Sequence, residues 1–291
     1  MSEKSIGLAL SGGGSRGPYH IGVIDGLEQF GLYPKDFEAI SGTSIGSMVG
    51  AMATYLSAKD MMQIWQGDTF SPETVLDISH DDLYNIPENR RQNAVMNHGV
   101  QNDPLRDGGI LQAVREQVSE QTVREANPEF YAAVCRSKIK FNNNTLSWIT
   151  GIALSDLVHL KINDLPMGKG GEAVLASCLM PIFKYVPLID GKYYFDGGAK
   201  DVLPYNALRN HNLDLLITSD IIPSGKTRKI MDGSLQKPAP ELIDVPRIHI
   251  SPPDYLPGTV VDFHGPYDEQ IYNQGREDAL RALDKNQDYL L

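Results

Sequence analysis

The beginning of the chain constrains the fold most, because it holds two short apolar runs that end at glycines and lead into helical patterns. Residues 6–10 (IGLAL) are followed by a serine and three glycines, which is typical of a buried strand in a parallel sheet. Pro18 then occupies a first helical position, and apolar residues recur at helical spacing up to a glycine stop. A second short strand at residues 39–41 enters the sequence GTSIG, after which residues 47–57 again have a helical pattern. The first 58 residues therefore predict a βαβα unit with a parallel sheet.

The length of 291 residues fits one large α/β domain, and the hydrophobic share of 41% allows a sizeable core. We predict a single domain over residues 1–291, a three-layer α/β/α sandwich with a largely parallel central sheet. Between about residues 68 and 144 the patterning weakens, and only residues 110–118 carry a helical pattern. Two interpretations of this segment stay open, a cap over the functional site and an inserted surface segment without a catalytic part.

The later part of the chain contains further strand and helix patterns but no internal repeat. Strands are predicted at residues 146–154, 157–162, 192–195, 213–218 and 245–250. Helices are predicted at residues 171–179 and 268–288, and a loop rich in Pro, Gly, Ser and Lys at residues 222–241.

The charge of the chain limits its partners. A formal net charge of −11 argues against a cationic nucleic-acid-binding face and against strong adhesion to anionic bilayers. No run of about 18 apolar residues is present, and residues 1–4 lead directly into a strand, so we predict a soluble, cytoplasmic protein with at most transient membrane contact. Cys135 and Cys178 are the only cysteines and have no metal or redox spacing, which predicts two buried thiols and no metal site.

The strongest local motif is Gly42-Thr43-Ser44-Ile45-Gly46 between a predicted strand and a predicted helix. A serine at such a sharp turn projects out of the fold, and Gly42 and Gly46 avoid clashes with neighbouring backbone. The helix that follows directs its first N–H groups, beginning with Ile45, toward the serine, which favours negative charge as a carbonyl becomes an oxyanion. This context indicates a serine nucleophile.

A second motif, residues 12–17 (GGGSRG), follows the first strand. Gly12, Gly14 and Gly17 satisfy the dinucleotide-binding spacing G-x-G-x-x-G, so a nucleotide-binding module is one alternative. That fingerprint needs an acidic residue at the end of the next strand, where this chain has the serine turn instead. The other functional reading is an oxyanion loop, whose backbone N–H groups at Gly12, Gly13 and Gly14 converge on a developing negative oxygen.

A serine nucleophile needs a base, and the chain offers seven histidines, at positions 20, 80, 98, 159, 211, 249 and 264. An α/β-hydrolase has its catalytic residues in the order Ser-Asp-His, and His264, the last histidine of the chain, is the candidate weighed for this order. That fold places several strands before its nucleophile, whereas Ser44 leaves room for two, so His264 is interpreted as a structural loop residue. Asp196 is the better candidate, because it ends a strand and is followed by Gly197 and Gly198, which let its carboxylate approach a second backbone.

Taken together, SGGGSRG, GTSIG and DGG resemble the patatin-like phospholipases, whose pattern joins a glycine-rich loop, a G-x-S-x-G elbow and a D-G-G/A motif in this order. The stretch ASCLMPIF, which leads to DGKYYFDGG, is similar to the segment that precedes the family's aspartate. The resemblance is dense over residues 5–58 and 171–220 and thin between them.

The resemblance implies a Ser-Asp dyad of Ser44 and Asp196, an oxyanion hole around Gly12, Gly13, Gly14 and Arg16, and no metal or cofactor. Arg16 has two open roles, orienting a lipid phosphate or bracing the loop. The implied activity is hydrolysis of carboxylic esters of lipids through an acyl-enzyme. An esterase or thioesterase acting on small soluble acyl compounds is the alternative, because the same dyad would support it, and a non-enzymatic nucleotide-binding module is a remote one.

Overall fold

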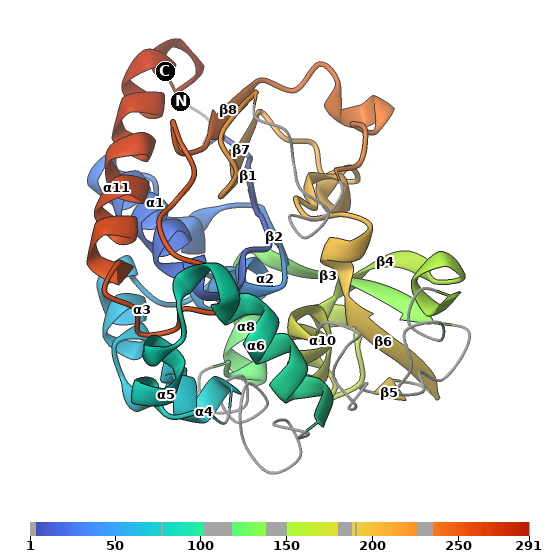
Figure 1. The fold of residues 1–291 in the computed structure, drawn as a ribbon. Helices are drawn as coiled ribbons and strands as arrows, with labels where there is room; N and C mark the ends of the chain where they lie inside the picture. The colour runs from blue at the N-terminus through green and yellow to red at the C-terminus, as the bar shows by residue number, and fades with distance from the viewer. Residues whose placement is uncertain are drawn as a thin grey trace.

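The computed structural model describes residues 4–76, 78–101, 118–137, 150–179, 188–189, 191–225 and 235–290. Within them a mixed, mostly parallel sheet is flanked by helices (Figure 1), so the predicted α/β fold is confirmed. The strands are β1 (Ile6–Leu10), β2 (Ala39–Thr43), β3 (Glu129–Ser137), β4 (Asp156–Lys161), β5 (Leu188–Ile189), β6 (Lys192–Asp196), β7 (Leu215–Ser219) and β8 (Arg247–Ile250). Their order is β5-β6-β3-β2-β1-β7-β8, and β4 pairs with β3.

Helices cover the sheet and build the lower part of the molecule in the view of Figure 1. They are α1 (Gly17–Gln29), α2 (Ile45–Ala53), α3 (Ala58–Trp65), α4 (Pro72–Leu76), α5 (His80–Asn85), α6 (Glu88–Gln101), α8 (Glu120–Glu125), α10 (Gly170–Cys178) and α11 (Asp268–Lys285). The last helix, α11, runs alongside α1 (Figure 1), so the two ends of the chain contribute to one layer.

Alternate residues of the central strands enter two separate apolar clusters, as the two-residue period of a strand requires. Leu8 and Ile40 belong to the larger cluster, which the α-helices complete. Ala9 and Ala39 point to the opposite face and pack in a smaller cluster with residues 202–216. In this second layer the sheet is covered by the short 3-10 helices η6 (Tyr205–Leu208) and η8 (Pro240–Leu242), so it is thinner than the first.

Strand β3 holds the sheet together because it is long enough to pair with three others. Tyr131 pairs with both β2 and β4, and Cys135 pairs with both β4 and β6. A strand has only two edges, so β4 occupies one edge of β3 while β2 and β6 share the other. Thr43, the last residue of β2, pairs with Ala133, and the last residue of β6, Asp196, pairs with the next residue of β3. The two strands therefore approach each other end to end.

Most elements expected from the sequence are present with small shifts at their ends. Six strands were expected where β1, β2, β4, β6, β7 and β8 lie, at residues 6–10, 39–41, 157–162, 192–195, 213–218 and 245–250. Helices α1 and α2 follow the two glycine motifs as expected, and α10 and α11 match the helices expected at residues 171–179 and 268–288. Both cysteines are buried free thiols, as expected.

One expected strand is wrong, the long strand β3 was not expected, and one expected pattern lies outside the described residues. The strand expected at residues 146–154 is wrong where the structure describes it, because residues 150–153 are helical. The sequence patterns also missed β3, which lies in the weakly patterned segment between residues 68 and 144. The helical pattern at residues 110–118 falls almost entirely outside the described residues.

Gly197 follows the last residue of β6 and lies directly against the backbone of β3. A substitution at Gly197 therefore tests how closely the end of β6 packs on β3. A Cβ atom on Gly197 would lie 2.5 Å from the carbonyl oxygen of Ala133, a distance at which backbone must move. We expect Gly197→Ala to lower the free energy of unfolding by about 1–3 kcal/mol, measured by urea denaturation. The control is Gly171→Ala in α10, where no described residue lies within 4 Å of the added methyl group, so that stability should stay the same or increase slightly. Equal losses in the two variants would contradict the close packing at Gly197.

Candidate active site

Ser44 stands alone between strand β2 and helix α2 in a strained backbone conformation. Its φ of 54° and ψ of −128° are rare for a residue with a side chain and cost on the order of 1–3 kcal/mol. A Cβ on Gly42 would lie 2.2 Å from the carbonyl oxygen of Gly46, and a Cβ on Gly46 would lie 2.4 Å from that of Ser11. Only glycine at these two positions lets α2 begin so close to β1 and β2, and the serine side chain is thereby held out of the turn.

Residues at the end of helix α10 fix this strained turn by hydrogen bonds to the N–H and to the carbonyl oxygen of Ser44. Ser177 accepts the backbone N–H of Ser44 on its hydroxyl oxygen (2.9 Å) and donates that hydroxyl to the carbonyl of Ala133 in β3 (2.7 Å). The Cys178 thiol donates to the carbonyl oxygen of Ser44 at 3.2 Å. The carbonyl of Leu179 accepts the N–H of Asp196 at 2.8 Å. Three consecutive residues therefore position Ser44 and Asp196 relative to each other.

One stretch of the sequence carries a signal that could indicate this arrangement. Ser177, Cys178 and Leu179 belong to the stretch ASCLMPIF, which is similar to the segment that precedes the family's aspartate. The second half of that stretch lies outside the described residues. Ser177 and Cys178 are both buried small polar residues at a helix end, a pattern that alone does not indicate what they contact.

Asp196 is buried, and its surroundings set both its orientation and its pKa. The residue is 7% exposed, and its Oδ1 atom accepts the N–H of Gly198 at 2.7 Å. Burial raises the pKa of the Asp196 carboxyl to about 6, whereas hydrogen bonds from the Gly198 N–H and from the Ser44 hydroxyl act in the opposite direction. The structure thus brings together the two residues predicted to form a dyad, and a carboxyl with this pKa is ionised at neutral pH.

The glycine loop after β1 faces the serine. A Cβ on Gly12 would lie 3.2 Å from the Cβ of Ser44, so the loop and the elbow are in contact. The Gly12 N–H donates to the carbonyl of Val202 at 2.9 Å and is already engaged. Among the described residues, the N–H groups of Gly13, Gly14 and Ile45 have no acceptor. Of the residues expected around an oxyanion hole, these three therefore have an N–H that could bind an oxyanion. The missing side chain of Gly12 instead lets the loop lie close to Ser44.

Arg16 and Gly17 connect the loop to other segments. The Arg16 guanidinium donates to the carbonyl of Gly258 at 2.9 Å, which matches the bracing role of the two that the sequence left open. Gly17 begins helix α1 directly against an indole, because a Cβ there would lie 2.5 Å from the Trp65 ring.

No histidine contacts the Ser44 hydroxyl among the described residues, which include all seven histidines. His264 has a positive φ of 51°, and its Nε2 lies 2.7 Å from the carbonyl of Trp65, as expected for a structural loop residue. His20 lies between the carbonyl of Ser11 and the hydroxyl of Ser219, at 2.8 Å from each. Burial lowers the pKa of His20 to about 4, so this imidazole is neutral at physiological pH.

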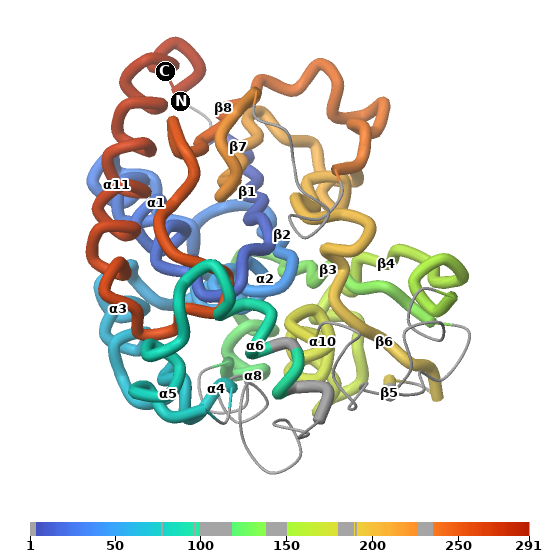
Figure 2. The backbone as a smooth tube through the Cα atoms, in the orientation of Figure 1, coloured from blue at the N-terminus to red at the C-terminus, as the bar shows by residue number. Residues whose placement is uncertain are grey.

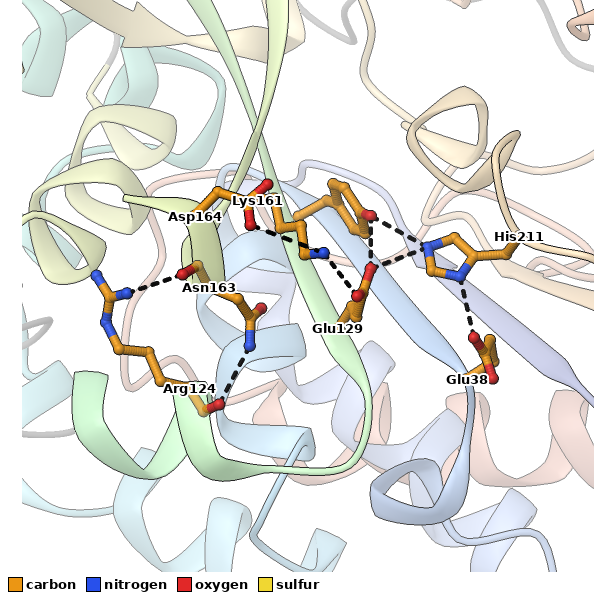
Figure 3. A network of polar contacts seen from close by, with 8 residues as sticks. Glu38, Arg124, Glu129, Lys161, Asn163, Asp164 and His211 are labelled. Atoms are coloured by element: carbon orange, nitrogen blue, oxygen red, sulfur yellow. Dashed lines mark hydrogen bonds and ion pairs between the residues drawn. The ribbon is translucent and has the colours of Figure 1, made fainter. Parts of the chain in front are cut away.

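His211 belongs to a polar network at the opposite end of the parallel strands (Figure 3). Its Nδ1 lies 3.2 Å from Glu38, which precedes β2, and its Nε2 lies 3.3 Å from Glu129, which begins β3. Lys161 of β4 pairs with the other oxygen of Glu129 at 2.6 Å. Because Glu38 and Glu129 stand where parallel strands start and Ser44 follows where one ends, His211 is a structural residue here.

The fold and the elbow together define an α/β protein that carries a partly exposed serine at a strand-to-helix turn, opposed by a buried carboxylate. The family model described as patatin-like phospholipase matches residues 8–209, and the chain belongs to this family. This match covers all three sequence motifs and strand β3. It favours the acyl-hydrolase interpretation of the glycine loop over the dinucleotide-binding one.

Comparison with individual proteins gives a short sequence match and a broad structural one. Lysophospholipase NTE1 of Yarrowia lipolytica is 46% identical over 65 residues, which is 22% of this chain and 4% of that protein, so the match spans a small part of the relative's length. Human GIVD cytosolic phospholipase A2 has a TM-score of 0.55 at 10% identity, covering 99% of this chain and 59% of the other. VipD from Legionella pneumophila has a TM-score of 0.51 at 14% identity, covering 97% and 67%. At these identities the two structures show a shared fold.

The described residues contain no helix that is both long and apolar enough to span a membrane.

The hydrogen bonds of Ser177 give a test of how the elbow is held. Ser177→Ala leaves the partly buried N–H of Ser44 without its acceptor, which should lower the free energy of unfolding by about 1–3 kcal/mol. The matched control is Ser47→Ala in α2, because the Ser47 hydroxyl is buried and has no hydrogen-bond partner in the part of the chain that the structure describes. Chemical denaturation should show Ser47→Ala unchanged or slightly more stable. A Ser177→Ala protein as stable as Ser47→Ala would contradict the role assigned to Ser177.

Proposed function

We propose that this protein is a lipid acyl hydrolase that cleaves carboxylic esters with Ser44 as nucleophile and Asp196 as its base. The observation that carries the proposal is the pairing of the strained Ser44 with the buried carboxylate of Asp196, which accepts a hydrogen bond from its hydroxyl. Family membership supports lipid esters as the substrate class. The relative named lysophospholipase supports a phospholipid carrying one acyl chain as the first substrate to examine.

The proposed mechanism has two halves that use the same groups. Asp196 accepts the proton of the Ser44 hydroxyl while the serine oxygen attacks the acyl carbonyl. The N–H groups of Gly13, Gly14 and Ile45 hold the resulting oxyanion, and the partial positive charge at the beginning of α2 adds to their effect. Asp196 then protonates the departing alcohol, which leaves an acyl-enzyme. In the second half, Asp196 accepts a proton from water, which attacks the acyl group, and the proton returns to Ser44.

The roles of the two residues predict a clear pattern of variants. Ser44→Ala removes the nucleophile and Asp196→Asn removes the proton acceptor, so each should lower kcat by roughly 10⁴-fold or more. His264→Ala should retain most of the activity, because His264 is bound to the Trp65 carbonyl and not to the serine. The measurement is release of fatty acid from lysophosphatidylcholine, with circular dichroism as a check of folding. A loss in His264→Ala as large as that in Ser44→Ala would disprove the dyad.

The raised pKa of Asp196 predicts the pH dependence of the reaction. Only the ionised carboxylate accepts the serine proton, so kcat/KM should be low below pH 6 and should rise as the pH passes through about 6. A pH series with a monomeric p-nitrophenyl ester measures this directly and avoids changes in lipid packing. A profile that is flat between pH 5 and pH 7 would contradict Asp196 as the base.

Products from mixed phospholipids, compared between the wild type and Ser44→Ala by mass spectrometry, would identify the head group and the acyl position. A wild-type protein that cleaves monomeric esters but no lipid would favour an esterase on small acyl compounds. A single catalytic domain, transient membrane contact and a cytoplasmic location stay predictions, and fractionation of cells that produce the protein would test the last two.

A further inference from the structure

The glycine loop is held in place by a turn far along the chain. Three successive carbonyl groups, those of residues 258, 259 and 260, accept hydrogen bonds from the side chain of Arg16 (2.9 Å), the hydroxyl of Ser15 (2.8 Å) and the backbone N–H of Ser15 (2.9 Å). A Cβ on Gly14 would lie 2.1 Å from the carbonyl oxygen of Val260. The position of the Gly13 and Gly14 N–H groups therefore depends on the shape of this turn.

Asp262 fixes that turn and links it to a helix. One carboxylate oxygen, Oδ2, accepts the backbone N–H of Thr259 at 2.7 Å. The other, Oδ1, accepts from the guanidinium of Arg91 at 2.8 Å, and the two side chains are only 4% and 8% exposed. Asp262 is thus shared between the turn that supports the glycine loop and helix α6.

Arg91 is held as firmly as Asp262. Its Nε and its second terminal nitrogen each donate to a backbone carbonyl, those of Leu83 and Ile86, both at 3.2 Å. Its guanidinium lies 4.6 Å from the centre of the Tyr84 ring, and the Tyr84 hydroxyl donates to the carbonyl of Phe263 at 3.1 Å. Figure 2 shows the segment that leads into α11 beside α6, the helix that carries Arg91.

We propose that the buried Arg91–Asp262 pair is a positioning device, through which helices α5 and α6 hold the glycine loop in the geometry that the oxyanion requires. The inference rests on the proposed function, since it assumes that Ser44 attacks a carbonyl beside this loop. It also gives part of the segment between residues 68 and 144 a role in the reaction, although neither Arg91 nor Asp262 touches the reacting atoms.

The chemistry of the two side chains explains why they suit this task. A guanidinium is planar and always charged, so it directs several N–H groups at fixed angles, which a lysine does not do. A buried charge without its partner is strongly unfavourable, so the pair has one low-energy arrangement. Oxyanion stabilisation depends on donors at the correct distance, and a displacement of about 1 Å lowers rates by about 10²-fold.

The experiment compares Arg91→Met and Arg91→Lys with a matched control, Arg90→Met, which removes the same charge from the neighbouring exposed position of α6. Two rates are measured: labelling of Ser44 by a fluorophosphonate, and hydrolysis of a p-nitrophenyl ester, each with thermal unfolding as a check of folding. We expect Arg91→Met to lower the labelling rate and kcat by roughly 10- to 100-fold with KM near the wild-type value. Arg91→Lys should recover part of the loss, and Arg90→Met should behave as the wild type.

The double variant Arg91→Met, Asp262→Leu keeps the test valid if the single variant does not fold, because it leaves no unpaired buried charge. A folded double variant with lowered kcat and unchanged KM supports the positioning role. A folded Arg91→Met or double variant with wild-type labelling and kcat would overturn it. A wild-type protein that neither reacts with the fluorophosphonate nor cleaves the ester would instead overturn the proposed function.

Discussion

The pairing of one edge of β3 with two different strands is the constraint on which the candidate site depends. Strand β2 runs parallel to β3 and ends at Thr43, and β6 runs antiparallel to it and ends at Asp196. Because β4 occupies the other edge, the ends of β2 and β6 meet at consecutive residues of β3. Ser44, the proposed nucleophile, and the carboxylate of Asp196 are 152 positions apart in the chain and are thereby placed side by side.

Strain at Ser44 makes the surrounding hydrogen bonds necessary. A φ of 54° at a residue with a side chain is retained only where its neighbours determine the conformation. Here the end of α10 holds both peptide groups of Ser44 through Ser177 and Cys178, and Ser177 also bonds to β3. Strand β3 thus aligns the ends of β2 and β6 and also anchors Ser177, the residue that fixes the turn at Ser44. On the other side of the serine, the turn at residues 258–260 supports the glycine loop.

Much of the fold and the central part of the site could be predicted from the sequence. Motifs with a local mechanism were reliable: the strand and helix around Ser44, the strand that ends at Asp196, and the glycine loop are all where the sequence placed them. The failures share a cause. Strand β3 was missed because its residues EFYAAVCRS show no clear alternation, and it needs none, since residues 132–135 are buried on both faces of the sheet. The oxyanion donors were predicted as a group, but whether Gly12 keeps its N–H free depended on where Val202 lies.

The sequence by itself determined the chemical groups and their immediate backbone: a serine at a glycine-flanked turn, a carboxylate before two glycines, and a glycine-rich loop after the first strand. These features are local, because they depend on the steric needs of a few consecutive residues. Only the tertiary structure decided how the groups meet, through the register of β3, the contacts of Ser177, and the pair Arg91–Asp262. Such contacts join residues far apart in the chain, and a buried hydroxyl or guanidinium does not reveal its partner in the sequence, since that partner is selected by packing.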